Sequence, residues 1–260
     1  MGKIVSIHSF RGGTGKSNAA ANLAAQAALR GKRVGVVDTD IQSPGIHVLF
    51  GLDETNMGAT LNDFLHGKCE IEDVAFSVGE KAADGEGRKK LAGKDLWLIP
   101  SSIRGREISR VIREGYDVNR LNEGLQNLIE KKKLDYLFID THPGLNEETL
   151  LSIAISDILL VILRPDNQDF QGTAVTVDIA RSLDVTNLLL MVNKAVPNKY
   201  DYNDLKQQIE ESYKAPLTGI LPLNFDIADN ASKDLFSLRF PDHPWSRELV
   251  KVAEAILAVE

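Results

Sequence analysis

The stretch Arg11-Gly12-Gly13-Thr14-Gly15-Lys16-Ser17-Asn18 separates two segments of different character. The apolar run 3–8 before it favours a β-strand, and the Ala- and Leu-rich run 18–29 after it favours an α-helix. A glycine-rich turn between a strand and a helix N-terminus gathers backbone N–H groups around one hollow, where the helix dipole adds positive potential. Such a hollow suits a phosphate chain. The stretch therefore predicts a P-loop.

Two residues of this loop have defined roles in P-loops. A lysine at the position of Lys16 reaches the β- and γ-phosphates, and a hydroxyl at the position of Ser17 binds Mg²⁺. The alternative is a chance Gly-rich turn without a ligand. The strand, the loop, the Lys-Ser pair and the helix are all in register, and we therefore expect a nucleoside triphosphate bound with Mg²⁺.

The loop departs from the common GxxxxGKS pattern, because position 10 is Phe10 instead of glycine. With Arg11 before a Gly-Gly pair, it resembles the deviant Walker A family typified by MinD and ParA, whose loop reads KGGxGKS or KGGxGKT. In that family the first lysine reaches the partner subunit's phosphates in a nucleotide-sandwich dimer. Arg11 occupies its place here, and a guanidinium can contact phosphate bidentately, although its length and planarity differ from those of an ammonium group. The resemblance implies an ATP-bound homodimer, with the phosphates held by Arg11, Gly12, Gly13, Thr14, Gly15, Lys16, Ser17 and Asn18.

Composition bounds the class of protein. With 260 residues, 43% of them hydrophobic, the chain can bury a large core as one α/β domain. The single cysteine, Cys69, excludes an internal disulfide framework and metal sites built from several cysteines, and it favours a reducing, cytoplasmic location. No signal peptide and no run of about 18 apolar residues is seen, so we expect no membrane span. The net charge of −7 disfavours indiscriminate nucleic-acid binding.

Acidic residues follow two further predicted strands. The strand 34–37 ends in Asp38-Thr39-Asp40, and the strand 134–139 ends in Asp140. Because ligands bind at the carboxyl ends of strands in open parallel sheets, we expect these carboxylates beside the nucleotide. An apolar strand ending in aspartate is the Walker B pattern, so Asp140 is predicted to reach Mg²⁺ directly or through water. The alternative for Asp38 and Asp40 is a pair of solvated strand-end acids.

The resemblance adds roles to this edge of the sheet. It implies that Asp38 supports the Mg²⁺ shell, that Asp40 orients the attacking water, and that the loop 41–46 and Gly144 respond to the γ-phosphate as switches. His142 stands where the family commonly has proline, and it either tunes the switch or is structural. For the base, the resemblance places Asn193 at the adenine edge and Pro222 in the loop whose backbone lines the base. The guanine signature NKxD is incomplete, because no acid follows Asn193-Lys194-Ala195.

Strands and helices alternate along the rest of the chain. Further strands are expected at 96–100, 158–163, 188–192 and 217–221, with helices at 60–65, 145–156, 171–182 and 202–213. This alternation predicts a doubly wound, mostly parallel sheet with helices on both faces, in a single domain over residues 1–260. The polar, Gly-rich segment 77–95 is expected to form a solvent-exposed loop or hairpin tip. A last helix within 245–259 is expected to pack on the core, and its mixed charge offers no anchor to a membrane surface.

One predicted helix carries a row of arginines. Arg106, Arg110 and Arg113 are spaced to lie on one helix face, as needed for contact with DNA phosphates. Glu107 and Glu114 interleave with them, as on an ordinary solvated helix face, so both interpretations stay open.

Three classes of function are compatible with these motifs. The first is a ParA/MinD-like positioning ATPase, whose ATP-bound dimer sits on nucleoid DNA and distributes a plasmid, chromosome region, carboxysome or other large assembly, with hydrolysis stimulated by an adaptor protein. The second is a regulatory ATPase of the same family that acts through protein partners alone, in cell division, flagellar or pilus control. The third is an enzyme such as an amide-forming ligase or a tyrosine kinase. No substrate pocket for a ligase can be identified, and no tyrosine cluster follows Tyr213, so the first two are favoured.

Overall fold

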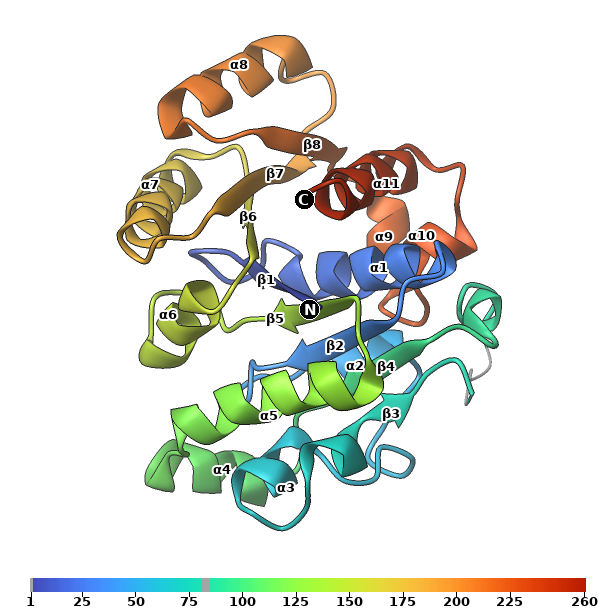
Figure 1. Ribbon diagram of the computed structural model, residues 1–260. Helices are drawn as coiled ribbons and strands as arrows, with labels where there is room; N and C mark the ends of the chain where they lie inside the picture. Colours follow the sequence, from blue (N-terminus) through green and yellow to red (C-terminus); the bar gives the residue numbers. More distant parts are fainter. Residues whose placement is uncertain (1, 81–84) are drawn as a thin grey trace.

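A single sheet of eight strands organises the molecule. The computed structural model describes residues 2–80 and 85–260. Their strands lie in the order β3-β4-β2-β5-β1-β6-β7-β8, and every neighbouring pair is parallel except β3 and β4 (Figure 1). The predicted doubly wound, mostly parallel α/β fold is therefore confirmed. The strands are β1 (Lys3–His8), β2 (Val34–Asp38), β3 (Phe76–Ser77), β4 (Leu96–Ile99), β5 (Tyr136–Asp140), β6 (Ile158–Leu163), β7 (Asn187–Ala195) and β8 (Leu217–Pro222).

Helices cover both faces of the sheet. One face packs against α1, α10 and α11, and the other packs against α3 and α5 over one part and α6, α7 and α8 over the rest (Figure 1). The helices are α1 (Lys16–Leu29), α2 (Ile46–Leu49), α3 (Leu61–Leu65), α4 (Gly105–Glu114), α5 (Val118–Lys132), α6 (Glu147–Ala154), α7 (Asn167–Ser182), α8 (Tyr202–Tyr213), α9 (Phe225–Asn230), α10 (Phe236–Arg239) and α11 (Pro244–Leu257). Short 3₁₀ helices occupy Ile71–Val74 and Arg88–Leu91.

Helix α1 is buried along most of its length, and small alanine side chains let it pack tightly on the sheet. It begins at Lys16, two residues before the predicted start, because Gly15 adopts a left-handed conformation (φ 89°) that turns the loop into the helix. Gly31, with φ 78°, follows the helix end and redirects the chain into β2. The glycine-rich loop therefore leads directly into a helix that is buried along most of its length.

The expectation of a solvent-exposed segment at 77–95 is only partly correct for the residues that the structure describes, because Glu86 and Lys89 are exposed but other residues are buried. Val78 and Leu91 are fully buried, and Arg88 is nearly so. The carboxylate of Asp234 accepts the backbone N–H groups of Gly87 and Arg88 at 2.7 and 3.1 Å, which ties this segment to α10. The remaining residues of the segment, 81–84, lie outside the described ranges.

The C-terminal helix packs into the core, as predicted. Trp245, Leu249, Val252 and Ile256 on α11 are buried against α1 and β8. No helix in the described part of the chain is both long enough and apolar enough to cross a bilayer.

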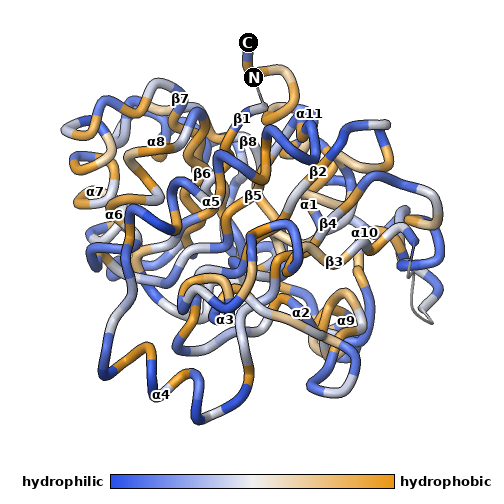
Figure 2. Tube along the Cα trace, turned by 60° about the horizontal axis from the view of Figure 1, so that its bottom comes forward, coloured by the Kyte–Doolittle hydropathy of each residue, from blue (hydrophilic) through white to orange (hydrophobic). Residues whose placement is uncertain are grey.

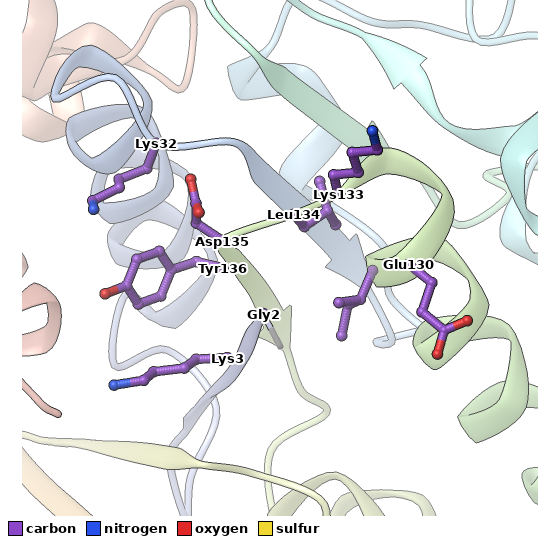
Figure 3. A pocket seen from close by; sticks show the side chains of 9 residues that line it. Gly2, Lys3, Lys32, Glu130, Lys133, Leu134, Asp135 and Tyr136 are labelled. Atoms are coloured by element: carbon purple, nitrogen blue, oxygen red, sulfur yellow. The ribbon is translucent and has the colours of Figure 1, made fainter.

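A cavity of about 460 Å³ opens at the amino ends of β1 and β5. The side chains of Lys3, Lys32 and Tyr136 extend to the same side of it (Figure 3). The Lys3 ammonium donates to the Val259 carbonyl at 2.5 Å, so part of the lining serves to hold the chain after α11. This cavity lies at the end of the sheet opposite the phosphate-binding loop, and none of the predicted site residues lines it.

Candidate nucleotide-binding site

The predicted carboxylates and the phosphate-binding loop meet at one edge of the sheet. Strand β5 lies between β1 and β2, and Asp140 is in register with Ile7 on one side and with Asp38 on the other. The loop that follows β1 therefore lies at the same edge of the sheet as the carboxylates of Asp38 and Asp140. These strands are not consecutive in the sequence. They become neighbours only because the order of strands in the sheet differs from their order along the chain.

A buried ion pair forms the centre of the site. The Lys16 ammonium donates to Asp140 Oδ1 at 2.5 Å, and both side chains are almost completely buried. Asp140 Oδ2 and the Thr14 hydroxyl oxygen are also buried, yet neither has a hydrogen-bond partner among residues 2–80 and 85–260. Buried polar atoms are normally paired. A bound phosphate chain with its cation would supply partners to both atoms, so the residues present fit such a ligand.

Asp38 is held in an electrostatically unfavourable position. Its carboxylate accepts the backbone N–H groups of Asp40 and Gly45, each at 3.1 Å. Complete burial, followed by the neighbouring Asp140 carboxylate, raises the pKa of Asp38 to about 8. A cation bound between these carboxylates would relieve both effects.

Asp40 and His142 face each other across the two loops that follow β2 and β5. Asp40 Oδ1 accepts the Ser43 N–H at 3.1 Å and lies 3.7 Å from His142 Nε2. Burial raises the pKa of the Asp40 carboxyl group, and the nearby His142 and Lys16 offset part of that effect. His142 Nδ1 is 2.7 Å from the Pro143 carbonyl, so it donates there and directs Nε2 towards Asp40. The side chain of His142 therefore lies between the two loops predicted to respond to the γ-phosphate.

His8, which no motif had singled out, is buried at the end of β1. The Thr141 hydroxyl donates its hydrogen bond to the Ile7 carbonyl. Thr141 Oγ1 is therefore the acceptor, and His8 Nδ1 the donor, in the 3.0 Å contact between them. Burial, Lys16 and His142 lower the pKa of His8 to about 3. His8 is therefore neutral near pH 7 and adds no charge to the phosphate-binding edge.

Arg11 is held by helix α7 of its own chain. Its guanidinium donates to the Gln168 side-chain carbonyl and lies 3.8 Å from Asp169 Oδ1, while 41% of the side chain stays exposed. Asp169 is buried and receives two further bonds from the Arg164 guanidinium, both at 2.9 Å. Sequence analysis missed these partners of Arg11, which lie more than 150 positions away and belong to no local motif.

Phe10, the residue that replaces the usual glycine, also packs against α7. A Cβ atom at Gly172 would lie 2.1 Å from the Phe10 ring, so only glycine leaves room for the ring. A groove beside this contact is lined by Phe10, Arg11, Gln168 and Val175. The unusual start of the loop is therefore matched by a glycine on the facing helix.

The residues expected to surround the base also come together. Gly15, Asn18, Asn193 and Pro222 line one cavity of about 220 Å³, together with residues from α9 and α11. The Asn193 amide donates to the Thr14 carbonyl at 2.7 Å and accepts the Lys194 N–H at 2.9 Å. Asn193 thus holds the phosphate-binding loop in addition to lining the cavity. Lys194, which sequence analysis did not place in the site, donates to the Gly13 carbonyl at 2.7 Å.

The side chains present fit Mg²⁺ that arrives with a nucleotide. No group of three or more His, Cys, Asp or Glu side chains in the described residues could hold a metal ion by itself. Mg²⁺ commonly binds through one or two carboxylates, waters and substrate phosphates. Asp38, Asp140 and Ser17, the second residue of α1, supply such a set.

Comparison with known proteins agrees with this geometry. A family model described as an AAA domain matches residues 2–192. The chain belongs to this family. An uncharacterized ATP-binding protein of Methanocaldococcus jannaschii is 26% identical over 261 residues, which cover 100% of this chain and 89% of that protein.

Solved structures of the same fold include MinD and ParA proteins. The cell division ATPase MinD of Pyrococcus furiosus has a TM-score of 0.79 at 22% identity, with 99% of each chain covered. MinD of Pyrococcus horikoshii, complexed with Mg-ADP, has a TM-score of 0.77 at 20% identity, covering 98% of this chain and 96% of that chain. A ParA family ATPase of Chlorobium tepidum has a TM-score of 0.72 at 17% identity, with 100% of both chains covered. The predicted resemblance of this chain to the MinD/ParA family of P-loop ATPases is confirmed.

Proposed function

We propose that this MinD/ParA-family protein binds ATP with Mg²⁺ and hydrolyses it slowly, as a switch that controls the association of two copies. The observation that carries the proposal is the buried Lys16–Asp140 pair, together with two buried polar atoms, on Thr14 and Asp140, that have no partner in the described part of the chain. Burying charges is costly unless further partners satisfy them. A phosphate chain with its cation offers partners to Lys16, to the Thr14 hydroxyl and to the free oxygen of Asp140.

Each polar side chain of the site has a separate task in this proposal. Lys16 binds the β- and γ-phosphates, and the loop N–H groups orient them. Ser17, Asp38 and Asp140 would hold Mg²⁺, which when bound neutralises phosphate charge. Asp40, placed on the loop after β2, accepts a hydrogen bond from the attacking water and directs it at the γ-phosphate. Asn193 and Pro222 line the adenine.

Association of two copies is the proposed output of the switch. Arg11 lies at the exposed rim of the loop and reaches the partner subunit's phosphates once both chains carry ATP. The names of similar proteins, a cell division ATPase and a plasmid partition protein, support a role in positioning or partitioning an intracellular cargo. We extend this proposal to a cargo that is carried on nucleoid DNA. A protein adaptor accelerates hydrolysis, which releases the dimer.

Titration calorimetry with ATP and Mg²⁺ tests the proposal directly. We expect a single saturable site per chain, weaker binding of GTP, and a doubled mass in size-exclusion chromatography when a non-hydrolysable ATP analogue is present. A chain that neither takes up ATP nor changes its mass would refute the proposed function.

Helix α4 is the proposed DNA-contacting element. It projects from the body of the molecule (Figure 2), and Val111 is its one buried residue. Arg106, Arg110 and Arg113 are exposed on it, although Arg110 pairs with Glu114 at 2.8 Å. Exposed arginines on a projecting helix can release counterions from the DNA backbone. The ion pair with Glu114 reduces, but does not remove, this positive surface.

The double variant Arg106→Glu/Arg110→Glu tests this contact. We expect ATP-dependent retention of non-specific DNA to weaken at least about tenfold in gel-shift assays at low salt, because two phosphate contacts become repulsive. Lys206→Glu/Arg247→Glu reverses two exposed charges on α8 and α11 and should leave retention unchanged. If the unmodified chain retains no DNA at low salt, the regulatory ATPase that acts through proteins alone becomes the better proposal.

A further inference from the structure

Another cavity, of about 330 Å³, shares helix α9 with the proposed base-binding cavity. It is lined by residues of α9 and α10 and of the segment before α11, chiefly Asp226, Asp229, Phe236, Arg239, Phe240 and His243. None of these residues belongs to the nucleotide site described above. Their side chains combine aromatic rings with carboxylates, a combination that suits an organic cation.

The two carboxylates are available to a ligand to different extents. Asp229 is exposed and forms no ion pair within the described part of the chain. His243 Nδ1 accepts the Trp245 N–H at 3.1 Å, and its Nε2 lies 3.0 Å from the Asn224 side-chain nitrogen and 3.3 Å from Asp226 Oδ2. Asp226 keeps 64% of its side chain exposed despite this contact. The cavity therefore offers acceptor oxygens at its rim.

The aromatic wall already binds one guanidinium. Arg239 lies 4.9 Å from the centre of the Phe240 ring, and its charge is offset by Glu86 at 3.3 Å. Phe240 remains 40% exposed, and Phe225, at the start of α9, is 82% exposed. Exposed aromatic side chains beside a cavity are typical of binding surfaces.

We propose that this cavity binds an alkyl guanidinium or alkyl ammonium group. The cationic head contacts Asp229 and Asp226, and its alkyl stem lies along Phe240. Such a group could come from a free amine or from an arginine or lysine side chain of a peptide. In the second case the neighbouring apolar residue of the peptide covers Phe225.

Helix α9 also forms the wall between this cavity and the base cavity. Ile227 and Ala228 line the base cavity, whereas Asp226 and Asp229 line the cation cavity. A ligand in one cavity therefore acts on the position of α9 and on affinity in the other cavity. This coupling, unlike cation binding itself, rests on the proposed binding of ATP.

Trp245 provides a signal for the test. Its ring lies 5.6 Å from Phe236, edge to face, and the chain has one other tryptophan, Trp97. In a Trp97→Phe chain without nucleotide, we expect agmatine to change Trp245 fluorescence with a Kd of about 1 mM. Asp229→Asn should weaken binding about tenfold, since it removes one charge-assisted contact. Asp242→Asn, which alters an acid that is 93% exposed and does not line the cavity, should have no effect.

A second probe separates the two sources of the cation. Acetyl-Leu-Arg-amide should bind more tightly than agmatine and lose that advantage in Phe225→Ala if the natural ligand is a peptide. Equal affinity of both probes supports a free amine. Calorimetry on the unmodified chain repeats the measurement without relying on fluorescence.

Two results would overturn parts of the proposal separately. The cation site is wrong if neither probe binds at a concentration of about ten times the expected Kd. It is also wrong if the Asp229→Asn chain binds the probes as tightly as the parent chain does. If ATP binds with the same affinity with and without saturating agmatine, the coupling through α9 is wrong. Absence of any ATP binding would refute the proposed function and leave the cation site standing.

Discussion

Replacing Asp40 with alanine should lower ATP hydrolysis by about 10²- to 10³-fold while nucleotide binding is retained. The carboxylate of Asp40 contacts neither Lys16 nor Asp140, the central pair of the site, so its removal leaves that pair intact. Its burial and the facing His142 hold it in one place at the phosphate-binding edge. Loss of a fixed acceptor for the attacking water slows the reaction far more than it weakens the ground-state complex.

Phosphate release measures the loss of hydrolysis, and size-exclusion chromatography with ATP measures the expected accumulation of dimer. Asp178→Ala, which removes an exposed acid from α7, is the matched control and should hydrolyse ATP at the parent rate. Parent-like turnover in Asp40→Ala would exclude Asp40 from the proposed role. Loss of ATP binding in the same variant would show that Asp40 supports the structure of the site instead.

The grouping of the candidate site residues at one edge of the sheet was predictable because its signals are local. A few neighbouring residues are enough to predict a loop between a strand and a helix, or an aspartate at the end of an apolar strand. The structure brings the residues of these two motifs, Lys16 and Asp140, into direct contact. The same holds for Asn193 and Pro222, which share a cavity with Gly15 and Asn18. Short-range patterns are sufficient where the parallel sheet itself collects the strand ends.

Other features depend on partners that are distant in sequence. The segment 77–95 has the composition of an exposed loop, yet Asp234 caps Gly87 and Arg88 and the segment packs on α10. The short antiparallel strand β3 has two residues, too few for any periodicity. Such contacts are tertiary, and composition carries no information about which distant carboxylate will satisfy a backbone N–H.

The start of the loop shows how a departure from a motif is accommodated. Phe10 requires the space that Gly172 leaves, and Arg11 requires an acceptor, which Gln168 and Asp169 provide. All three partners lie on α7. Helix α7 therefore fixes the direction of Arg11 within the single chain. In the proposed dimer this would lower the entropy that is lost when the guanidinium contacts a phosphate of the second chain.

Arg11→Ala should consequently abolish ATP-dependent dimerisation while ATP affinity changes by less than about threefold. The variant is expected to fold, because Asp169 keeps its bidentate contact with Arg164 when Arg11 is removed. Loss of a charge-assisted contact at each of two symmetric positions weakens the dimer by about 10²-fold or more. Sedimentation with a non-hydrolysable ATP analogue measures the dimer, and calorimetry measures the nucleotide.

Arg11→Lys separates charge from shape at this position. A lysine keeps the charge and restores the residue that the MinD/ParA pattern has, but it loses the planar fork that contacts Gln168 and Asp169. If dimerisation requires only a cation, this variant behaves like the parent chain; if the hold by α7 is needed, it falls between the parent and Arg11→Ala. A full-strength ATP dimer in Arg11→Ala would show that a different cation bridges the two chains, and Lys194, which already contacts the loop at Gly13, would be the next residue to replace.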